Sequence, residues 1–149
     1  MYIEIRKARS EDITAVCKIV NQLTPGQPHD YRNAVEKFTT HIRLSDDYYL
    51  WVAELDGKIV GTAMMHLQHK LSYQCGTAAH VEDLIVDKKH KGMGIGDMLV
   101  KKAIETAKKH SCYKIMLTCY PKTASYYERF KFVKHDIGMK RVLINELYT

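Results

Sequence analysis

Two kinds of residue that could do chemistry lie close together in the middle of the chain. Glu82 and Asp83 are adjacent carboxylates within an apolar run, and glycines follow at every second position, Gly92, Gly94 and Gly96. A carboxylate can accept a proton from a reacting group, directly or through water. Glycines before a helix let backbone N–H groups approach a phosphate, where the helix dipole favours negative charge. The pattern indicates a proton acceptor followed by an anion site, with a solvated carboxylate pair and a plain tight turn as the alternatives.

The loop that holds the glycines does not match the common phosphate-binding motifs. A P-loop ends in Gly-Lys-Ser or Gly-Lys-Thr, and the dinucleotide fingerprint is G-x-G-x-x-G, whereas the spacing here is G-x-G-x-G. The apolar run at residues 81–86 predicts a strand before the loop, and periodicity predicts a helix over about residues 95–110 after it. The anion site would therefore lie at a strand–loop–helix junction.

Other elements must position this junction. Alternation of apolar and polar residues predicts four more strands, at residues 2–6, 48–54, 58–67 and 113–119. Helical spacing predicts three more helices, at residues 11–20, 31–42 and 123–130. Ser10 is the expected N-cap of the first helix, and Asp56-Gly57 predicts a hairpin turn. Residues 68–79 are expected to be a polar connection, and residues 132–133 and 139–143 to be closing strands.

The order of these elements predicts the fold class. Strand, helix and strand over residues 80–119 make a right-handed crossover unit, so its two strands should be parallel neighbours. The hairpin adds antiparallel strands. We therefore predict an α/β (α+β) fold with a mixed, twisted β-sheet and helices on both faces, in a single domain over residues 1–149.

Composition and charge restrict the classes of function. The net charge of +6 and the pI near 9.1 suit an anionic partner, such as a phosphorylated small molecule or a phosphate-bearing cofactor. Neither an arginine-rich arm nor a helix-turn-helix pattern accompanies that charge, so nucleic acid is not the expected partner. The chain shows no leader peptide and no apolar run near 18 residues, which predicts a cytoplasmic protein without a membrane span. The four cysteines and eight histidines lack metal-ligand spacing, which predicts reduced thiols and no metal.

A resemblance to a known family rests on several of these segments. The loop from Lys91 to Gly96 resembles Q/R-x-x-G-x-G/A, the signature of the GNAT superfamily of acyl-CoA-dependent N-acetyltransferases, with Lys91 where Gln or Arg is usual. The segments VEDLIV (81–86), CYKIML (112–117) and SYYERFKF (125–132) look like those of eukaryotic glucosamine-6-phosphate N-acetyltransferases. The resemblance covers roughly residues 20–141.

The resemblance implies acetyl-CoA as the co-substrate, an intertwined homodimer and a place for each cofactor contact. The strand backbone of Leu84, Ile85 and Val86 would pair with the pantetheine arm, and Thr123 would contact the cofactor. Tyr127 would lie near the sulfur and donate a proton to the departing thiolate. Backbone amides would hold the pyrophosphate at Lys91, Gly92, Met93, Gly94, Ile95 and Gly96.

The acceptor implied by the resemblance is the 2-amino group of glucosamine 6-phosphate, a substrate of amino-sugar metabolism. Glu82 and Asp83 would face that amine. The sugar-phosphate contacts would fall at Thr24, Lys70, Tyr113, Lys114 and Arg141.

The chain departs from the family pattern at three positions. Thr118 stands where an acidic residue is usual, Thr123 where Asn is common, and Lys131 where the family has Gly. Thr118 removes a carboxylate that would face an amino sugar, which keeps another amine open as the acceptor, such as a polyamine, an antibiotic or a peptide N-terminus. A non-catalytic module that senses acyl-CoA is the further alternative. Taken alone, Tyr127 could serve packing and His80 could be structural rather than a base.

Overall fold

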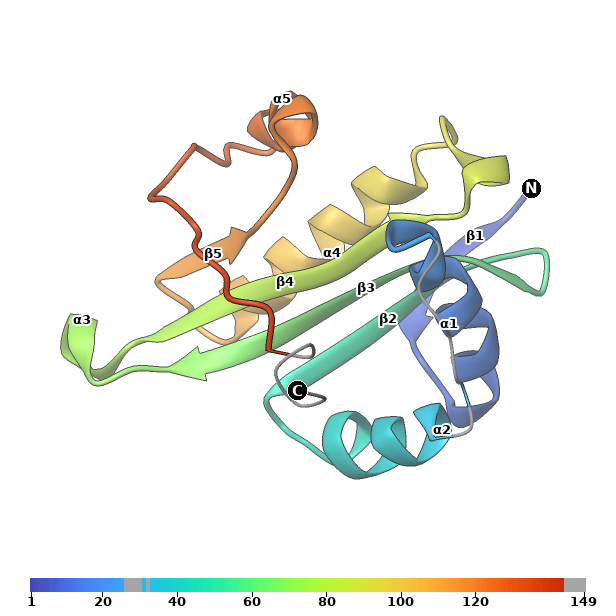
Figure 1. Cartoon of the computed structure of the whole chain (residues 1–149), viewed down its shortest axis with the longest axis horizontal. Helices are drawn as coiled ribbons and strands as arrows, with labels where there is room; N and C mark the ends of the chain where they lie inside the picture. The colour runs from blue at the N-terminus through green and yellow to red at the C-terminus, as the bar shows by residue number, and fades with distance from the viewer. Residues whose placement is uncertain (26–30, 32, 144–149) are drawn as a thin grey trace. The chain divides into compact units, whose positions relative to one another are not determined.

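The computed structural model describes residues 1–25, 31 and 33–143 (Figure 1). The chain forms two compact units, Met1–Leu117 and Thr118–Thr149. The first unit contains the whole sheet and the strand–loop–helix junction. The second contains the segment that begins after the last strand, and each unit is described here in its own terms.

The first unit is built on a five-stranded sheet in the order β1-β2-β3-β4-β5. Neighbouring strands are antiparallel except for β4 and β5, which are parallel. The strands are β1 (Ile3–Lys7), β2 (Tyr48–Leu55), β3 (Lys58–His69), β4 (Thr77–Val86) and β5 (Lys114–Leu117). Asp56 and Gly57 both have positive φ, 47° and 80°, and form the predicted hairpin turn. The predicted mixed sheet and the parallel crossover are confirmed.

Helices cover both faces of this sheet, as predicted (Figure 1). On the near face in Figure 1 lie α1 and α2, and on the far face lies α4. The α-helices are α1 (Ile13–Val20), α2 (Ala34–Lys37), α3 (Ser72–Cys75), α4 (Ile95–Lys109) and α5 (Ala124–Glu128). The shorter turns are η1 (Ser10–Asp12), η2 (Asn21–Leu23), η3 (Phe38–Arg43, π-helical), η4 (Lys88–His90) and η5 (Pro121–Thr123).

Alternation along the strands divides the core between the two faces. Trp51 belongs to the cluster that packs with Leu99 of α4, whereas its neighbour Val52 packs with Val16 of α1 and Phe38 of η3. Successive side chains of a strand point to opposite faces, so one strand serves both clusters. Because Leu99 is completely buried, its replacement by alanine should cost about 2–5 kcal/mol of the free energy of unfolding. The sheet is therefore a rigid platform for the loops at its ends.

Two helix predictions need correction. Ser10 does not cap α1, because a 3₁₀ turn begins at Ser10 after Arg9, and the Arg9 N–H donates to the Asp12 carboxylate at 2.7 Å. The second helix is shorter than predicted at its start, since α2 begins at Ala34, and it continues as the π-helical η3. Residue 32, inside the predicted range, lies outside the described residues.

The strand predictions also need correction at both ends of the junction. Residues 68–69 and 77–79 are strand rather than polar connection, because β3 runs to His69 and β4 begins at Thr77, and only residues 70–76 join the two strands. Residues 132–133 and 139–143 form no strand in the described part of the second unit. Alternation marks a segment that can pair, but a strand forms only beside a neighbour that accepts its hydrogen bonds. Within the described residues these segments have no such neighbour.

Candidate functional site

The carboxylate pair lies at an irregularity in the pairing of β3 with β4. Thr62 is opposite Ile85 and Met64 is opposite Glu82, so Asp83 and Leu84 together face the single residue between them on β3. Asp83 has φ +50°, in the left-handed region. This is the geometry of a β-bulge, which bends the strand and redirects its side chains.

The bulge brings two adjacent side chains to one face of the sheet. In a regular strand Glu82 and Asp83 would point to opposite faces. Here Glu82 contacts His80, whose neighbours in β4 pack against the α4 side, so His80 and Glu82 point to the α1 side. Asp83 lines a hollow together with residues of α1 and η3, on the same side. Both carboxylates therefore lie on the α1 side of the sheet, which alternation along a regular strand does not predict, and Asp83 lines the hollow there.

That hollow has a volume of about 390 Å³ and is open to solvent. Its size lies within the range of small-molecule sites. The β-sheet side contributes Leu50, Thr62, Met64 and Asp83, and the helical side contributes residues from α1, α2 and η3. The wall is largely apolar, so Asp83 is the one carboxylate among its lining residues. Asp83 offers a negative charge to a small ligand there, and Lys37 on the helical side offers a positive one.

The surroundings of Asp83 disfavour the charged form of its carboxyl group. Desolvation by the neighbouring protein raises the pKa of Asp83, and the negative charge of Glu82 raises it further. Both residues nevertheless keep substantial solvent exposure. Neither carboxylate is therefore buried. What distinguishes the pair is the bulge rather than burial.

The outer edge of β4 is open next to the bulge. Pairing with β5 covers only Ala78–Val81, so Leu84, Ile85 and Val86 have no strand beside them on that edge within residues 1–117. Backbone N–H and C=O groups on an open edge can pair with an extended ligand, as in strand addition. An amide-containing chain could therefore lie along this edge.

The edge leads directly into the glycine loop. Gly92 and Gly94 have φ of +81° and +77°, and Gly94 is the N-cap of α4. A side chain at either position would meet no atom within 4 Å, so glycine is required by the backbone conformation rather than by space. Ile95 and Gly96 form the first turn of the helix, where N–H groups lack partners within the helix. The geometry is suited to an anion at the end of the open edge.

A contact distant in sequence anchors this loop. The Gln22 side chain donates to the Asp87 carboxylate at 3.0 Å and accepts from the Lys88 backbone N–H at 3.1 Å. Asp87 also contacts His90 at 3.1 Å. The hydrogen bond from Gln22, followed by that from His90, lowers the pKa of Asp87. The sequence carries no signal for this bridge, since nothing in the pattern pairs η2 with the β4–α4 loop.

Comparisons with known proteins agree with this geometry. The model of the Acetyltransferase (GNAT) family matches residues 13–132. The chain belongs to the GNAT acetyltransferase family. It is 29% identical over 123 residues to glucosamine 6-phosphate N-acetyltransferase 1 of Oryza sativa subsp. japonica, covering 81% of this chain and 74% of the relative. It is 25% identical over 138 residues to glucosamine 6-phosphate N-acetyltransferase of Trypanosoma brucei brucei, covering 93% and 94%.

A solved structure agrees over nearly the whole chain. The crystal structure of glucosamine-6-phosphate N-acetyltransferase from Arabidopsis thaliana superposes with a TM-score of 0.84 at 28% identity. The match covers 95% of this chain and 99% of that chain. The GNAT fold predicted from the motifs is confirmed.

The expected sugar-phosphate contacts of this GNAT chain are spread over the first unit. Thr24 follows η2, two positions after Gln22. Lys70 follows β3, and Tyr113 and Lys114 lie at the start of β5. Lys114 is opposite Ala78, four residues from Glu82, or about 13 Å at roughly 3.3 Å per residue. The lysines therefore lie at the far end of β4 from the glycine loop.

The second unit contains Thr123, Tyr127 and Arg141. The Tyr127 ring contacts the rings of Tyr126 and Phe132 edge-on, with centroids 5.0 Å and 6.0 Å apart. Burial raises the pKa of Tyr127, and Cys119 adds a smaller effect in the same direction. The Thr123 hydroxyl donates to the Tyr120 carbonyl at 2.9 Å, which stabilises the turn before α5. The ligand contacts expected of these residues stay predictions.

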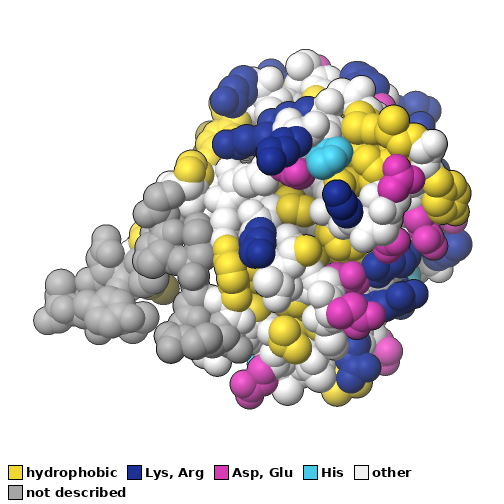
Figure 2. All heavy atoms as spheres, turned by 90° about the vertical axis from the view of Figure 1, so that its right-hand side faces the viewer, with side chains coloured by type: hydrophobic (Ala, Val, Ile, Leu, Met, Phe, Trp, Pro, Cys, Tyr) yellow, Lys and Arg dark blue, Asp and Glu magenta, His cyan; other side chains and the backbone are white. Residues whose placement is uncertain are grey.

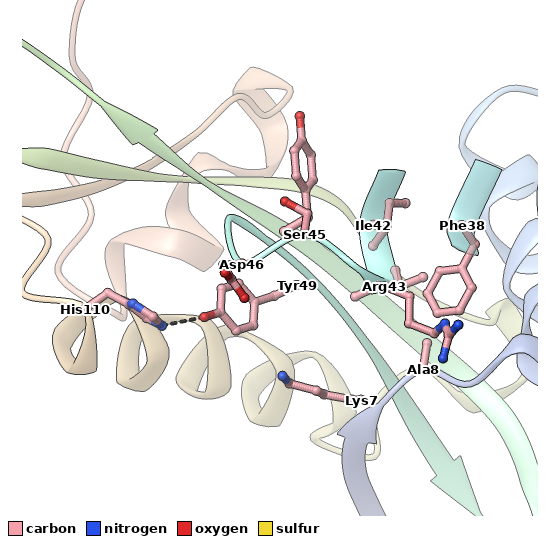
Figure 3. A pocket seen from close by; sticks show the side chains of 11 residues that line it. Lys7, Ala8, Phe38, Ile42, Arg43, Ser45, Asp46, Tyr49 and His110 are labelled. Carbon is pink, nitrogen blue, oxygen red and sulfur yellow. Dashed lines mark hydrogen bonds between the residues drawn. The ribbon is translucent and has the colours of Figure 1, made fainter. Parts of the chain in front are cut away.

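A second hollow, of about 350 Å³, lies away from the carboxylates (Figure 3). The Tyr49 hydroxyl and the His110 imidazole point toward each other there and are 2.5 Å apart. The Lys7 ammonium lies 5.2 Å from the centre of the Tyr49 ring. None of the residues expected to do chemistry lines this hollow.

The surface and the described helices give further information about the chain. On the face shown in Figure 2, basic and acidic side chains are interspersed rather than gathered by sign. Among the described residues, no helix is long and apolar enough to cross a membrane. No group of three or more His, Cys, Asp or Glu side chains within those residues could hold a metal ion.

Proposed function

We propose that this GNAT protein transfers the acetyl group of acetyl-CoA to the 2-amino group of glucosamine 6-phosphate. The observation that carries the proposal is the bulge at Asp83, which places Asp83 in the wall of a hollow with Glu82 next to it on the same side of the sheet, beside an open strand edge and a glycine-capped helix. The choice of sugar is supported by the relatives from Oryza sativa and Trypanosoma brucei, which are named for that activity.

The residues of the chain divide the work of the reaction. The backbone of Leu84, Ile85 and Val86 would pair with the pantetheine amides, and the N–H groups from Lys91 to Gly96 would bind the pyrophosphate. Holding both substrates on one rigid strand accounts for much of the rate, because orientation replaces a bimolecular encounter. Thr123 is the further cofactor contact in the proposal.

The carboxylates prepare the acceptor. Asp83 would bind the ammonium group at the hollow, and Glu82 would take its proton so that the neutral amine can attack the thioester carbon. Backbone N–H groups stabilise the negative charge that develops on the thioester oxygen. Tyr127 would then protonate the thiolate, and because burial raises its pKa it carries its proton at neutral pH. Thr24, Lys70, Tyr113, Lys114 and Arg141 would bind the sugar phosphate.

The proposal includes a homodimer in the cytoplasm. The extended segment after α5 exposes large apolar side chains, with Ile137 at 89% and Met139 at 94% of their full exposure, which suits burial against a second copy. All four cysteines are free, which suits a reducing compartment. Light scattering of the purified chain tests the dimer. A monomer at micromolar concentration would contradict it.

An amine panel with acetyl-CoA tests the activity. The purified protein is mixed with acetyl-CoA and glucosamine 6-phosphate, glucosamine, spermidine, an aminoglycoside or an alanine-initiated peptide, and free thiol is followed. We expect release with glucosamine 6-phosphate and a much lower kcat/KM with glucosamine, because the phosphate contacts are lost. Preference for another amine would overturn the sugar assignment, in line with Thr118. Tight binding of acetyl-CoA without turnover on any amine would favour a sensing role.

A further inference from the structure

A row of polar side chains crosses three strands and ends at Glu82. Tyr48 of β2 is opposite His66 of β3, and His66 is opposite His80 of β4. The residues next to His66 and His80 in sequence, Met65 and Val81 among them, pack on the α4 side, so the row lies on the α1 side with the carboxylates. The candidate site uses Glu82 but leaves both histidines without a role.

The members of the row are in contact. The rings of Tyr48 and His66 stack with centroids 5.5 Å apart, and those of His66 and His80 are 5.1 Å apart. His80 Nε2 lies 3.5 Å from Glu82 Oε1. The His80 side chain keeps 25% of its exposure and that of Glu82 keeps 45%. Two imidazoles therefore lie in a row of contacts that ends at a carboxylate of the site.

The charges around the pair favour a single shared proton. Burial lowers the pKa of His66, the neighbouring His80 lowers it further, and Glu82 acts in the opposite direction. Two imidazolium ions at ring-contact distance would repel each other. The other groups that face the pair are the Tyr48 hydroxyl on β2, Asp83 beyond Glu82, and Lys114, two positions before the Met116 that is opposite His80. Met64 and Gln68, which flank His66 on the same face, carry no charge.

We propose that His80 and His66 form a proton relay that removes the proton of the acceptor ammonium from Glu82. The inference rests on the proposed N-acetyltransferase function. The ammonium loses one proton to the Glu82 carboxylate, directly or through one water, and the carboxyl group passes it to His80 Nε2. The imidazolium then releases it to His66 or to solvent, so Glu82 is again a carboxylate before the next turnover. No electrons are exchanged, and both histidines are positioning residues because they act through Glu82.

Histidine is the suitable residue for this step. In model peptides an imidazole holds a proton about two pKa units more tightly than a glutamate carboxyl group, about 6.5 against about 4.3. An imidazole is therefore by its chemistry a stronger proton acceptor than a second carboxylate would be.

The pH dependence of kcat/KM with glucosamine 6-phosphate tests the relay. Because the neutral imidazole is the acceptor, activity of the wild type should fall as the pH drops through the titration of the pair. His80→Gln should lower kcat by about tenfold, leave the KM for acetyl-CoA unchanged, and move the acidic limb to lower pH, where only carboxylates titrate. His69→Gln is the control, since His69 lies on β3, the strand of His66, and pairs with Asp47 at 2.8 Å, outside the row. An unchanged kcat and pH profile in His80→Gln overturns the relay.

Rescue by an external base separates proton transfer from packing. Imidazole added to His80→Ala should restore part of kcat in proportion to its concentration, while His69→Ala should not respond. A loss of kcat in His80→Ala that imidazole does not restore contradicts the relay, because a purely structural defect cannot be repaired by a proton acceptor in solution.

Titration of the histidines by NMR in the resting protein requires no turnover. We expect His66 and His80 to titrate as a coupled pair, the pKa of His66 to rise in His80→Gln, and the pKa of His66 to fall in Glu82→Gln. Independent titration of the two rings overturns this inference. Lack of turnover by the wild type with glucosamine 6-phosphate would instead overturn the proposed function, so the two failures are distinguishable.

Discussion

The Gln22 side chain holds Asp87 by a hydrogen bond of 3.0 Å across a sequence separation of 65 residues. The same amide group also binds the backbone of Lys88, so both hydrogen-bonding atoms of one side chain are used on one loop. This loop joins the strand that carries the carboxylates to the helix that begins after the glycines. The bridge therefore fixes the distance between the acceptor site and the proposed pyrophosphate site.

Removal of the Gln22 amide should loosen that loop. Gln22→Ala leaves the Asp87 carboxylate and the Lys88 N–H without this partner, so we expect the KM for acetyl-CoA to rise about fivefold, the equivalent of roughly 1 kcal/mol. The kcat should change little, since the carboxylates lie on β4 itself. Steady-state kinetics with each substrate varied in turn measures both. Asn21→Ala is a neighbouring control, and an equal rise in KM for that variant would contradict the assignment to Gln22.

Replacement of Gly94 separates a backbone effect from a binding effect. Gly94→Ala forces a side chain into the left-handed region and should cost about 1 kcal/mol of the free energy of unfolding. Gly57→Ala is a matched control, because Gly57 has φ +80° and the same open surroundings in a hairpin turn away from the loop. Both variants should lose similar stability in urea, but only Gly94→Ala should weaken acetyl-CoA binding in calorimetry. Equal acetyl-CoA affinity in the two variants would remove the loop from the cofactor site.

Asp83 should matter for the amine and not for the cofactor. Asp83→Asn removes the charge at the hollow, so we expect kcat/KM for glucosamine 6-phosphate to fall roughly 30-fold, with the KM for acetyl-CoA unchanged. Carboxyl ¹³C NMR should show Asp83 titrating above the usual aspartate pKa, because desolvation and Glu82 both favour its protonated form. Glu82→Gln should lower that pKa by removing the like charge. An ordinary aspartate pKa for Asp83 in both the wild type and Glu82→Gln would contradict the proximity of the two carboxylates.

The sequence alone predicted the hairpin turn and the strand and helix on either side of the glycine loop. Asp56-Gly57, the apolar run before the glycines and the helical stripe after them each act locally, so their structures follow from adjacent residues. The bulge at Asp83 was not predictable, because it arises from the register between β3 and β4 rather than from β4 alone. The Gln22 bridge and the histidine row are likewise consequences of packing between distant segments.

The wrong predictions for residues 139–143 and for Ser10 have the same origin. Residues 139–143 alternate like a strand, yet a strand needs a partner, and the described residues supply none. Ser10 has the type of an N-cap, but the buried Asp12 carboxylate binds the Arg9 N–H and the turn begins one residue earlier than a cap at Ser10 requires. In each case the available hydrogen-bond partner, rather than the residue type, decided the structure.

Tyr127 should act at the end of the reaction. Tyr127→Phe keeps the ring contacts with Tyr126 and Phe132 but removes the hydroxyl, so we expect kcat to fall roughly 100-fold with little change in either KM. Tyr120→Phe, at a mostly exposed tyrosine of the same unit, should be silent. Thiol release in the pre-steady state measures the chemical step. Full activity of Tyr127→Phe would assign this tyrosine to packing.

The charge cluster at the start of the chain should govern stability at low pH. Arg6 donates to Asp12 at 2.7 Å and 3.0 Å and to Glu54 at 2.8 Å, with only 15% of the Arg6 side chain and 7% of the Asp12 side chain exposed. Burial alone would raise the pKa of Asp12, but the hydrogen bonds from Arg6 and from the Arg9 backbone are together stronger and lower it. The carboxylate is thus stabilised by folding.

The sign of the pH dependence follows from that lowered pKa. The stabilisation is fully present at pH values above the pKa of Asp12 in the unfolded chain, which is near 3.8. It is lost as the pH falls through the lower pKa that Asp12 has in the folded protein. Arg6→Met should therefore lower the free energy of unfolding by about 2 kcal/mol at pH 7, and the difference from the wild type should shrink below pH of about 3.5. Urea unfolding at both pH values measures it.

Lys109→Met, which breaks the exposed pair with Glu105 at 3.2 Å, is the control and should cost nothing measurable. A loss in Arg6→Met no larger than in Lys109→Met, or one that stays constant down to pH 3, would show that the cluster does not hold the first turn.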